Sequence, residues 1–141
     1  MSATGLDVFD KTLHKTHSWL NDLMKTLGWQ DKHRAYSALR LTLHALRDRL
    51  TVQEAAQLGA QFPLLIRGIY FEGWDPNGKP LKERHKAQFL AHIESAFPEE
   101  VPFDAEEVAR AVFQLLDARI SEGEIQDVRH VLPTEIQELW P

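Results

Sequence analysis

The chain has 141 residues, of which 43% are hydrophobic, and Asp and Glu outnumber Lys and Arg by 21 to 16. This composition is typical of a soluble globular domain and excludes an intrinsically disordered chain. The net charge of -5 argues against a nucleic-acid binder, and no apolar run reaches the roughly 18 residues of a membrane span. With Cys 0, disulfides and thiolate metal sites are excluded, and we expect a bacterial-type cytoplasmic location and no cofactor.

The first expected helix carries one apolar stripe. Residues of the stripe recur at spacings of four and three from Phe9 to Leu27, which places them on one face of a helix. Gly28 follows directly and can end the helix in a left-handed conformation.

Three further helices are expected before residue 73. Asp31 is a plausible N-cap for a second helix, whose apolar stripe runs from Tyr36 to Leu50. Thr51-Val52-Gln53-Glu54 has the form of a capping box that begins a third helix. Pro63 suits the start of a short fourth helix, because its fixed φ fits the first turn.

The second half of the chain repeats this pattern at an offset of 70 residues. Identical residues coincide in this register without a gap, and the serine of a second capping box falls on Thr51. The pairs include Arg40 and Arg110, Arg49 and Arg119, Thr51 and Ser121, Glu54 and Glu124, Pro63 and Pro133, and Tyr70 and Trp140. Amphipathic periodicity alone would align leucines, but not a proline, an arginine and a cap together. We therefore predict an internal duplication.

No segment alternates with the period of two that a half-buried strand requires. The prediction is an all-α fold of two tandem pseudo-repeats of about four helices each, at residues 1–72 and 81–141. Residues 73–80 form a turn-rich linker with Asp-Pro and Asn-Gly steps. Because a unit of about 60 to 70 residues has a marginal core, we expect the repeats to pack as one body.

The aromatic segment at residues 70–74 is the strongest candidate for binding. Large aromatics flanked by charge are typical of protein-binding hot spots, and here they lie where a helix ends and a turn begins. Tyr70 is expected in the core, since its repeat counterpart is Trp140. Trp74 has no counterpart, so it is either a site or a structural joint between the repeats. The candidate binding residues are Arg67, Tyr70, Glu72, Trp74, His44 and Arg47.

A basic ridge lies beside the apolar stripe of the second helix. Arg40, His44 and Arg47 follow at spacings of four and three and could hold an anion or a carboxylate surface. A solvated face with Asp48 as a partner is the alternative that we favour, because basic side chains often cover an apolar stripe with their stems.

Two pairs of histidines have helical spacing. His14 and His17 lie three residues apart, with Asp10 one turn earlier, and are weak metal-ligand candidates. His85 and His92 form a second pair, seven residues apart. Exposed histidines on a helix face are the alternative that we favour for both.

The chain resembles a known family in Arg34-Ala35-Tyr36, in the segment from His44 to Leu50, and in Arg67-Gly68-Ile69-Tyr70-Phe71-Glu72-Gly73-Trp74. This pattern is similar to that of the bacterial family filed as domain of unknown function 2267, and the last segment is its most specific part. The resemblance implies a helical, prokaryotic, cytoplasmic protein with no established reaction, substrate or cofactor.

The sequence contains no catalytic signature. No Ser-His-Asp spacing, glycine-rich phosphate loop or nucleophile elbow occurs, so we expect a protein that is not an enzyme. The favoured function is a protein-interaction or scaffold module that could act as a homodimer, with no nucleic-acid or membrane partner. The alternative is a small-ligand or metal-binding protein with a pocket between the repeats, lined by His44, Arg47, Tyr70 and Trp74.

Overall fold

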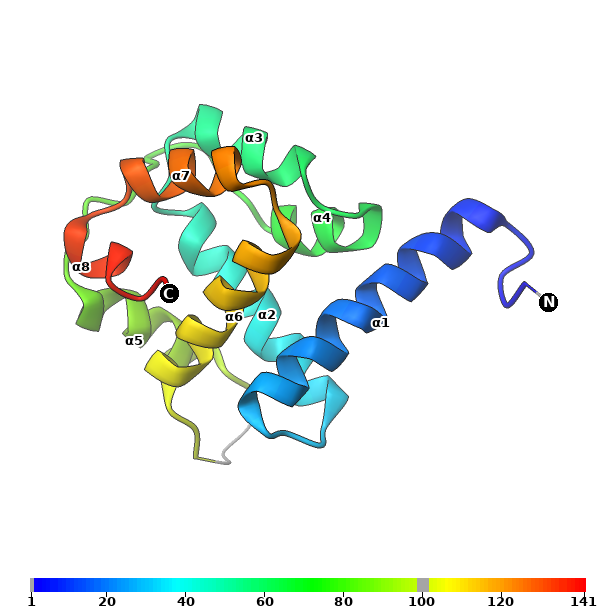
Figure 1. Cartoon of the computed structure of the whole chain (residues 1–141). Helices are drawn as coiled ribbons and strands as arrows, with labels where there is room; N and C mark the ends of the chain where they lie inside the picture. Colours follow the sequence, from blue (N-terminus) through cyan, green and yellow to red (C-terminus); the bar gives the residue numbers. More distant parts are fainter. Residues whose placement is uncertain (1, 99–101) are drawn as a thin grey trace.

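The computed structural model describes residues 2–98 and 102–141, and this part of the chain contains eight helices and no strand (Figure 1). The predicted all-α fold is confirmed. The helices are α1 (Asp7–Leu27), α2 (Lys32–Arg47), α3 (Val52–Ala60), α4 (Leu64–Phe71), α5 (Lys86–Ala96), α6 (Ala105–Arg119), α7 (Glu122–Val131) and α8 (Thr134–Gln137).

The expected start and stop signals are found at the helix ends. Gly28 ends α1 in the left-handed region with φ 70°, and its N–H donates to the Met24 carbonyl. The Asp31 carboxylate accepts from the backbone N–H groups of His33 and Arg34 at the start of α2. Pro63 occupies the N-cap position of α4.

Helix number and order agree between the two halves. An offset of 70 carries α3 onto residues 122–130 and α4 onto residues 134–141, where α7 and α8 begin at the corresponding residues. The first helices differ in length, because α5 begins at Lys86, the equivalent of Thr16. Residues 7–15 of α1 therefore have no helical counterpart. That the two halves superpose in space stays a prediction.

Each half packs its first helix on the second helix of the other half. Helix α1 contacts α6, and α5 contacts α2, while α2 also packs on α6 and α3 on α7. The buried side chains of both halves form one core, in which Leu23, Leu43, Phe89 and Phe113 are completely enclosed. This packing of the first helices joins the cores of the two halves into one.

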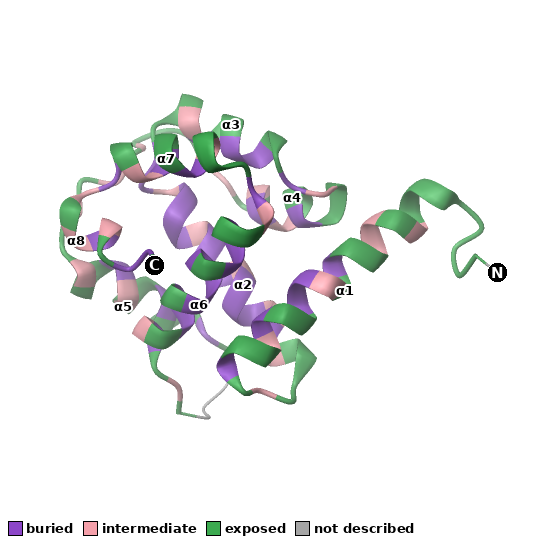
Figure 2. Ribbon diagram, viewed as in Figure 1, coloured by how far each residue is buried: buried purple, intermediate pink, exposed green. Residues whose placement is uncertain are grey.

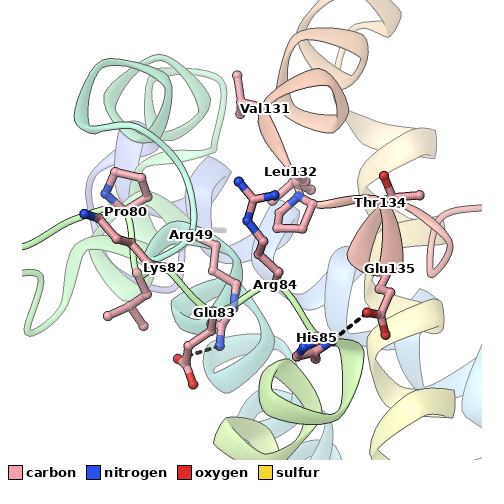
Figure 3. Close-up of a pocket in the computed structure, with 12 residues that line it drawn as sticks. Arg49, Pro80, Lys82, Glu83, Arg84, His85, Val131, Leu132, Thr134 and Glu135 are labelled. Atoms are coloured by element: carbon pink, nitrogen blue, oxygen red, sulfur yellow. Dashed lines mark hydrogen bonds and ion pairs between the residues drawn. The ribbon is translucent and has the colours of Figure 1, made fainter.

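The segment after α4 connects the halves along the surface of α2. The Leu81 N–H donates to the Asp48 carbonyl at 2.8 Å, and Glu83 pairs with the buried Arg49 guanidinium at 3.1 Å (Figure 3). Arg49 also lies over the Phe89 ring of α5, 5.0 Å from its centroid. The connection is thus held to the end of α2.

The N-terminal half of α1 projects away from the body (Figure 1). Its later residues Leu20, Leu23 and Leu27 are buried, whereas Val8 and Phe9 near its start are exposed (Figure 2). The helix therefore continues past the helices that bury its apolar stripe.

Only half of each expected capping box is present among the described residues. The Thr51 hydroxyl accepts from the Glu54 N–H at 3.1 Å, and the Ser121 hydroxyl accepts from the Glu124 N–H at 3.4 Å. The two glutamates do not return to their own caps. Because α3 packs on α7, the Glu124 and Glu54 carboxyls meet and share a hydrogen bond.

The meeting of these carboxyls raises the pKa of Glu124. Burial is the main cause, followed by the hydrogen bond and the negative charge of Glu54, and the pKa rises from 4.5 to about 7. The Oε1 atom of each carboxyl is buried and has no other hydrogen-bond partner in the described part of the chain. A proton shared between the two carboxyls removes the repulsion of two buried negative charges.

Replacement of Thr51 by alanine should reduce the free energy of unfolding by about 0.5–2 kcal/mol, because one donor at the start of α3 loses its cap. Urea denaturation measures the loss. Thr51→Ser keeps the hydroxyl and should recover most of it. Equal losses in the two variants would show that the methyl group, and not the cap, stabilises this helix.

The raised pKa of Glu124 predicts that the protein loses stability as pH rises from 4.5 to about 7. In this interval the folded chain holds a proton that the unfolded chain has released, so raising the pH favours unfolding. Thermal denaturation across the interval should show the decline in the wild type and its absence in Glu124→Gln. Glu122→Gln, at an exposed carboxyl of the same helix, is the matched control. A decline of the same size in Glu124→Gln would overturn the assignment.

Candidate functional site

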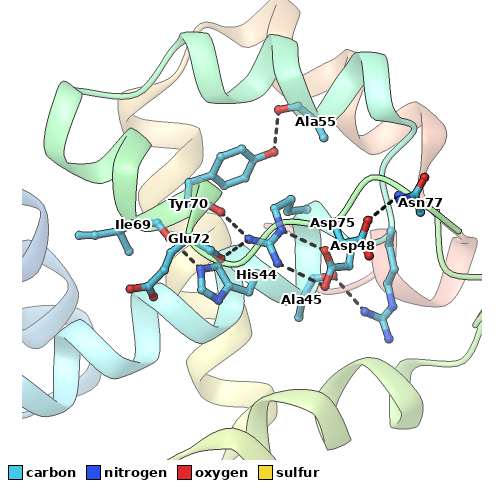
Figure 4. A network of polar contacts seen from close by, with 11 residues as sticks. His44, Ala45, Asp48, Ala55, Ile69, Tyr70, Glu72, Asp75 and Asn77 are labelled. Atoms are coloured by element: carbon cyan, nitrogen blue, oxygen red, sulfur yellow. Dashed lines mark hydrogen bonds and ion pairs between the residues drawn. The ribbon is translucent and has the colours of Figure 1, made fainter. Parts of the chain in front are cut away.

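The residues of the basic ridge converge on the end of α4. Arg47 Nη1 donates to the carbonyls of Tyr70 at 2.8 Å and Glu72 at 2.9 Å, and Arg47 Nε lies 3.0 Å from Asp48 Oδ1. The Arg47 side chain is only 6% exposed. Figure 4 shows this network between α2 and the end of α4. The guanidinium thus serves carbonyls that the helix end leaves without donors.

His44 and Arg40 extend the same network along α2. His44 Nε2 lies 2.7 Å from the Ile69 carbonyl, and Arg40 Nε donates to Glu72 Oε1 at 2.6 Å. Burial lowers the pKa of His44, with a smaller contribution in the same direction from the charges of Arg47 and Arg40. The neutral imidazole then carries its proton on Nε2 and donates it to the carbonyl. The hydrogen bond from Arg40 lowers the pKa of Glu72.

The side chains of the basic ridge, Arg40, His44 and Arg47, therefore bind groups within the protein. The Asp48 partner that we expected is present, and Arg40 stays partly exposed. All three side chains also bind residues 69–72, however, so the face is only partly solvated. The spacing of four and three indicated correctly that the three residues share a face. It could not indicate that the end of α4 lies against that face.

Tyr70 is a core residue, as its repeat position predicted. The ring is completely buried, and its hydroxyl donates to the Ala55 carbonyl at 2.8 Å. Burial raises the pKa of this phenol far above its usual range, so it stays protonated. The ring makes edge contacts with Phe62 and Phe71, at centroid distances of 5.0 and 4.8 Å.

Trp74 lies half-buried beside the core. Its ring is 5.3 Å from that of Phe71, and its Nε1 is buried without a hydrogen-bond partner among residues 2–98 and 102–141. Gly59 makes room for Phe71, because a Cβ there would come within 2.4 Å of the phenyl ring. The indole is thus partly packed against the core and partly accessible.

Arg67 serves a helix end as well. Its guanidinium donates to the carbonyls of Gly59, Ala60 and Phe62 at 3.1–3.3 Å. These carbonyls belong to the end of α3 and the turn that follows. The structure therefore brings His44, Arg47, Tyr70 and Glu72 together, while Arg67 and Trp74 lie in neighbouring contacts.

Three of the four histidines in these pairs have partners in the described part of the chain. His17 Nδ1 lies 3.3 Å from Lys32 Nζ, and the Asp10 carboxylate accepts from Ser2 and Thr4. His85 pairs with Glu135 at 2.7 Å, and His92 with Glu83 at 2.9 Å. Within the described ranges, no three His, Cys, Asp or Glu side chains are grouped so that they could hold a metal ion.

Among the cavities where the repeats meet, two are built from corresponding residues, and neither is lined by the four residues expected around an inter-repeat pocket. The first, the Arg49 cavity, has a volume of about 720 Å³ and lies between Arg49, residues 80–85 and residues 131–135 (Figure 3). The second, the Arg119 cavity, has a volume of about 520 Å³ and lies between α1, residues 60–64, Arg67 and Arg119. A third, of about 370 Å³, lies between the end of α1 and residues 104–114. The sequence feature that could have indicated the first two cavities is the equivalence of Arg49 with Arg119 and of Pro63 with Pro133 at the offset of 70 residues.

A family model described as "Uncharacterized conserved protein (DUF2267)" matches residues 16–139. The chain belongs to this family. The expected resemblance is thus confirmed, and it covers nearly the whole fold from the second half of α1 onward. No curated protein matches the chain. In the described part of this DUF2267 protein, no helix combines the length and apolarity needed to cross a membrane.

The most specific family segment of this DUF2267 chain, from Arg67 to Trp74, is mostly architectural. Arg67 bonds the end of α3, Tyr70 fills the core, and Glu72 binds Arg40. These contacts join α2, α3 and α4 within one repeat.

Arg47→Met should lower the free energy of unfolding by about 2–4 kcal/mol, because two carbonyls near the end of α4 lose their donor and each unsatisfied acceptor costs about 1–3 kcal/mol. Arg40→Met is the matched control. Its ion pair with Glu72 is substantially exposed, so its loss should cost less than about 1 kcal/mol. Urea denaturation compares the two variants. Similar small losses in both would show that water replaces the buried guanidinium.

Proposed function

We propose that this protein is a non-enzymatic protein-interaction module that docks through an apolar surface at the start of α1. The surface consists of Leu6, Phe9 and Leu13 on the projecting turns of α1 and of Leu64 and Leu65 on α4. Leu6, Phe9 and Leu64 are 48%, 50% and 52% exposed, and this exposure on a projecting element is the observation that carries the proposal. Large exposed apolar side chains gathered in one place are typical of interaction sites.

The two parts of this surface are adjacent. The Leu65 N–H donates to the Thr12 hydroxyl at 2.9 Å, which places the first turn of α4 against the second turn of α1. Phe9 precedes Thr12 by one helical turn and Leu13 follows it directly. The docking surface is therefore continuous across the two helices.

The apolar stripe of α1 is long enough to pack on the body of the protein with one part and on a partner with the other. From Leu20 to Leu27 it is buried within the chain, whereas Leu6 and Phe9 are exposed and Leu13, next to the contact with α4, is partly buried. A helix of the same kind laid on the projecting part would bury the remaining stripe.

We propose a second copy of the chain as the occupant. The first turn of α1 carries Asp7 and Asp10, and the next turn carries Lys11 and His14. In an antiparallel pair with its two-fold axis near Lys11, the acidic turn of each copy lies beside the basic turn of the other. The helix dipoles also oppose each other in this arrangement, which favours it further.

The proposal includes a bacterial cytoplasmic location. It is supported by the absence of cysteine and by the resemblance in the segment from Arg67 to Trp74. The absence of a catalytic signature supports a role in binding.

Phe9→Glu should weaken self-association by at least about thirtyfold, because a charge replaces the largest apolar side chain of the docking surface. Analytical ultracentrifugation over a range of protein concentrations measures the dimer. Val52→Glu, at an exposed apolar side chain of α3, is the matched control and should leave the dimer intact. A wild-type chain that stays monomeric at the highest concentrations, or equal losses in both variants, would overturn the proposal.

A further inference from the structure

We propose that the Arg49 and Arg119 cavities between the repeats are one kind of site built twice, and that the Arg119 cavity binds a phosphoryl group of a small molecule. The proposal rests on the lining of the cavities and does not need the dimer, although Leu64 belongs to both the Arg119 cavity and the docking surface.

Six positions of the two linings correspond at the offset of 70 residues. Each cavity combines the arginine at the end of the second helix of one repeat with the turn between the third and fourth helices of the other repeat. The corresponding positions are Arg119 and Arg49, Lys15 and His85, Gln61 and Val131, Phe62 and Leu132, Pro63 and Pro133, and Leu64 and Thr134. The cavities thus arise from the same crossing of helices.

Each arginine is held in the same manner. Arg119 lies over the Trp19 ring, 5.9 Å from its centroid, just as Arg49 lies over the Phe89 ring. Arg119 also donates to Ser18 at 2.8 Å and to Asp22. An arginine fixed by an aromatic ring and one carboxylate is pre-organised for binding an anion, because little side-chain freedom is lost.

The charges of the two cavities differ. Lys15, Arg67 and Arg119 line the Arg119 cavity, and no carboxylate is among its described lining residues. Asp22 compensates Arg119 from outside the lining, whereas the bonds of Arg67 go to uncharged carbonyls. Lys15 has no hydrogen bond or ion pair within the described chain. At least two positive charges therefore face this cavity without compensation.

The Arg49 cavity is closer to neutral. Its lining has the cations Arg49, Lys82 and Arg84 against the carboxylates Glu83 and Glu135, which pair with Arg49 and His85 (Figure 3). The equivalent of Lys15 is thus a histidine already bound to a carboxylate. The Arg119 cavity has three cations and no carboxylate among its described lining residues. The duplication supplies an internal comparison, in which similar walls carry different charge.

The size and the donors of the Arg119 cavity fit a phosphoryl ligand. A volume of about 520 Å³ is within the range of small-molecule pockets. Guanidinium and ammonium groups facing a common space bind phosphate oxygens through charge-assisted hydrogen bonds. The buried Trp19 lines the same cavity, so a bound anion should change the fluorescence of the protein.

The test uses inorganic pyrophosphate as the probe, with binding followed by calorimetry and by tryptophan fluorescence. Lys15→Gln should weaken binding by about fivefold or more, and Lys15→Glu by about twentyfold or more, because the charge facing the phosphate is removed or reversed. Lys15 has no structural bond to lose, so both variants should fold. Lys82→Gln, at a cation of the Arg49 cavity, is the matched control and should change the affinity by less than about twofold.

Two further measurements test whether the ligand must be a phosphoryl group and whether it comes from a free small molecule or from a lipid headgroup. Citrate should bind more weakly than pyrophosphate, and equal binding would overturn the phosphoryl assignment. Phosphatidylcholine vesicles with and without phosphatidic acid test a lipid headgroup as the source, and sedimentation that depends on both phosphatidic acid and Lys15 would support the same phosphoryl site. Absence of binding to both pyrophosphate and phosphatidic acid, or binding that Lys15→Glu leaves unchanged, would overturn the proposal.

The Phe9→Glu variant separates this proposal from the docking proposal. Phe9 does not line the Arg119 cavity, so the variant should bind pyrophosphate with wild-type affinity even where the dimer is lost. A loss of both properties in Phe9→Glu would show that the cavity needs the dimer and would overturn the independence of the two sites.

Discussion

The packing of each first helix on the second helices of both halves is the constraint on which the rest of the structure depends. Helix α1 packs on α2 and α6, and α5 packs on α6 and α2, so the first helices join the two halves. A unit of about 60 to 70 residues has a marginal core alone, and this packing provides a shared one. The arginines at the ends of α2 and α6 follow the same crossing, since each lies over the aromatic ring of the opposite first helix.

At several helix ends, arginine and histidine side chains donate hydrogen bonds to the last carbonyls, which would otherwise bind water. Arg47 and His44 serve carbonyls near the end of α4, Arg67 those of α3, and Arg110 donates to the Glu138 carbonyl just after α8. Such bonds let short helices pack with their ends against the body, because the last carbonyls of a helix need donors from elsewhere. They also explain why charged residues within the family segment are architectural.

The two proposed sites occupy places that this architecture leaves unused. The start of α1 extends beyond the helices that bury the rest of its stripe, and it lies before Thr16, where the family match begins. The Arg119 cavity results from the crossing of the repeats, but its charge comes from Lys15 and Arg67, which have no cationic equivalent in the other half. Leu64 borders both places, so a ligand in the cavity lies close to the docking surface.

The sequence by itself determined the local structure. The spacing of apolar residues predicted the all-α fold, and Gly28, Asp31, Thr51 and Pro63 marked helix boundaries, because caps and periodicity act over a few residues. The offset of 70 residues also predicted the number and order of the helices. Tyr70 was placed in the core by its repeat position.

The tertiary structure alone decided what each face meets. Periodicity shows which face of a helix is buried, but not which partner covers it. For this reason the sequence could not show that His44 and Arg47 bind the end of α4, or that Glu54 and Glu124 share a hydrogen bond. The sequence could not show the cavities either, because their walls come from opposite repeats that only long-range packing brings together.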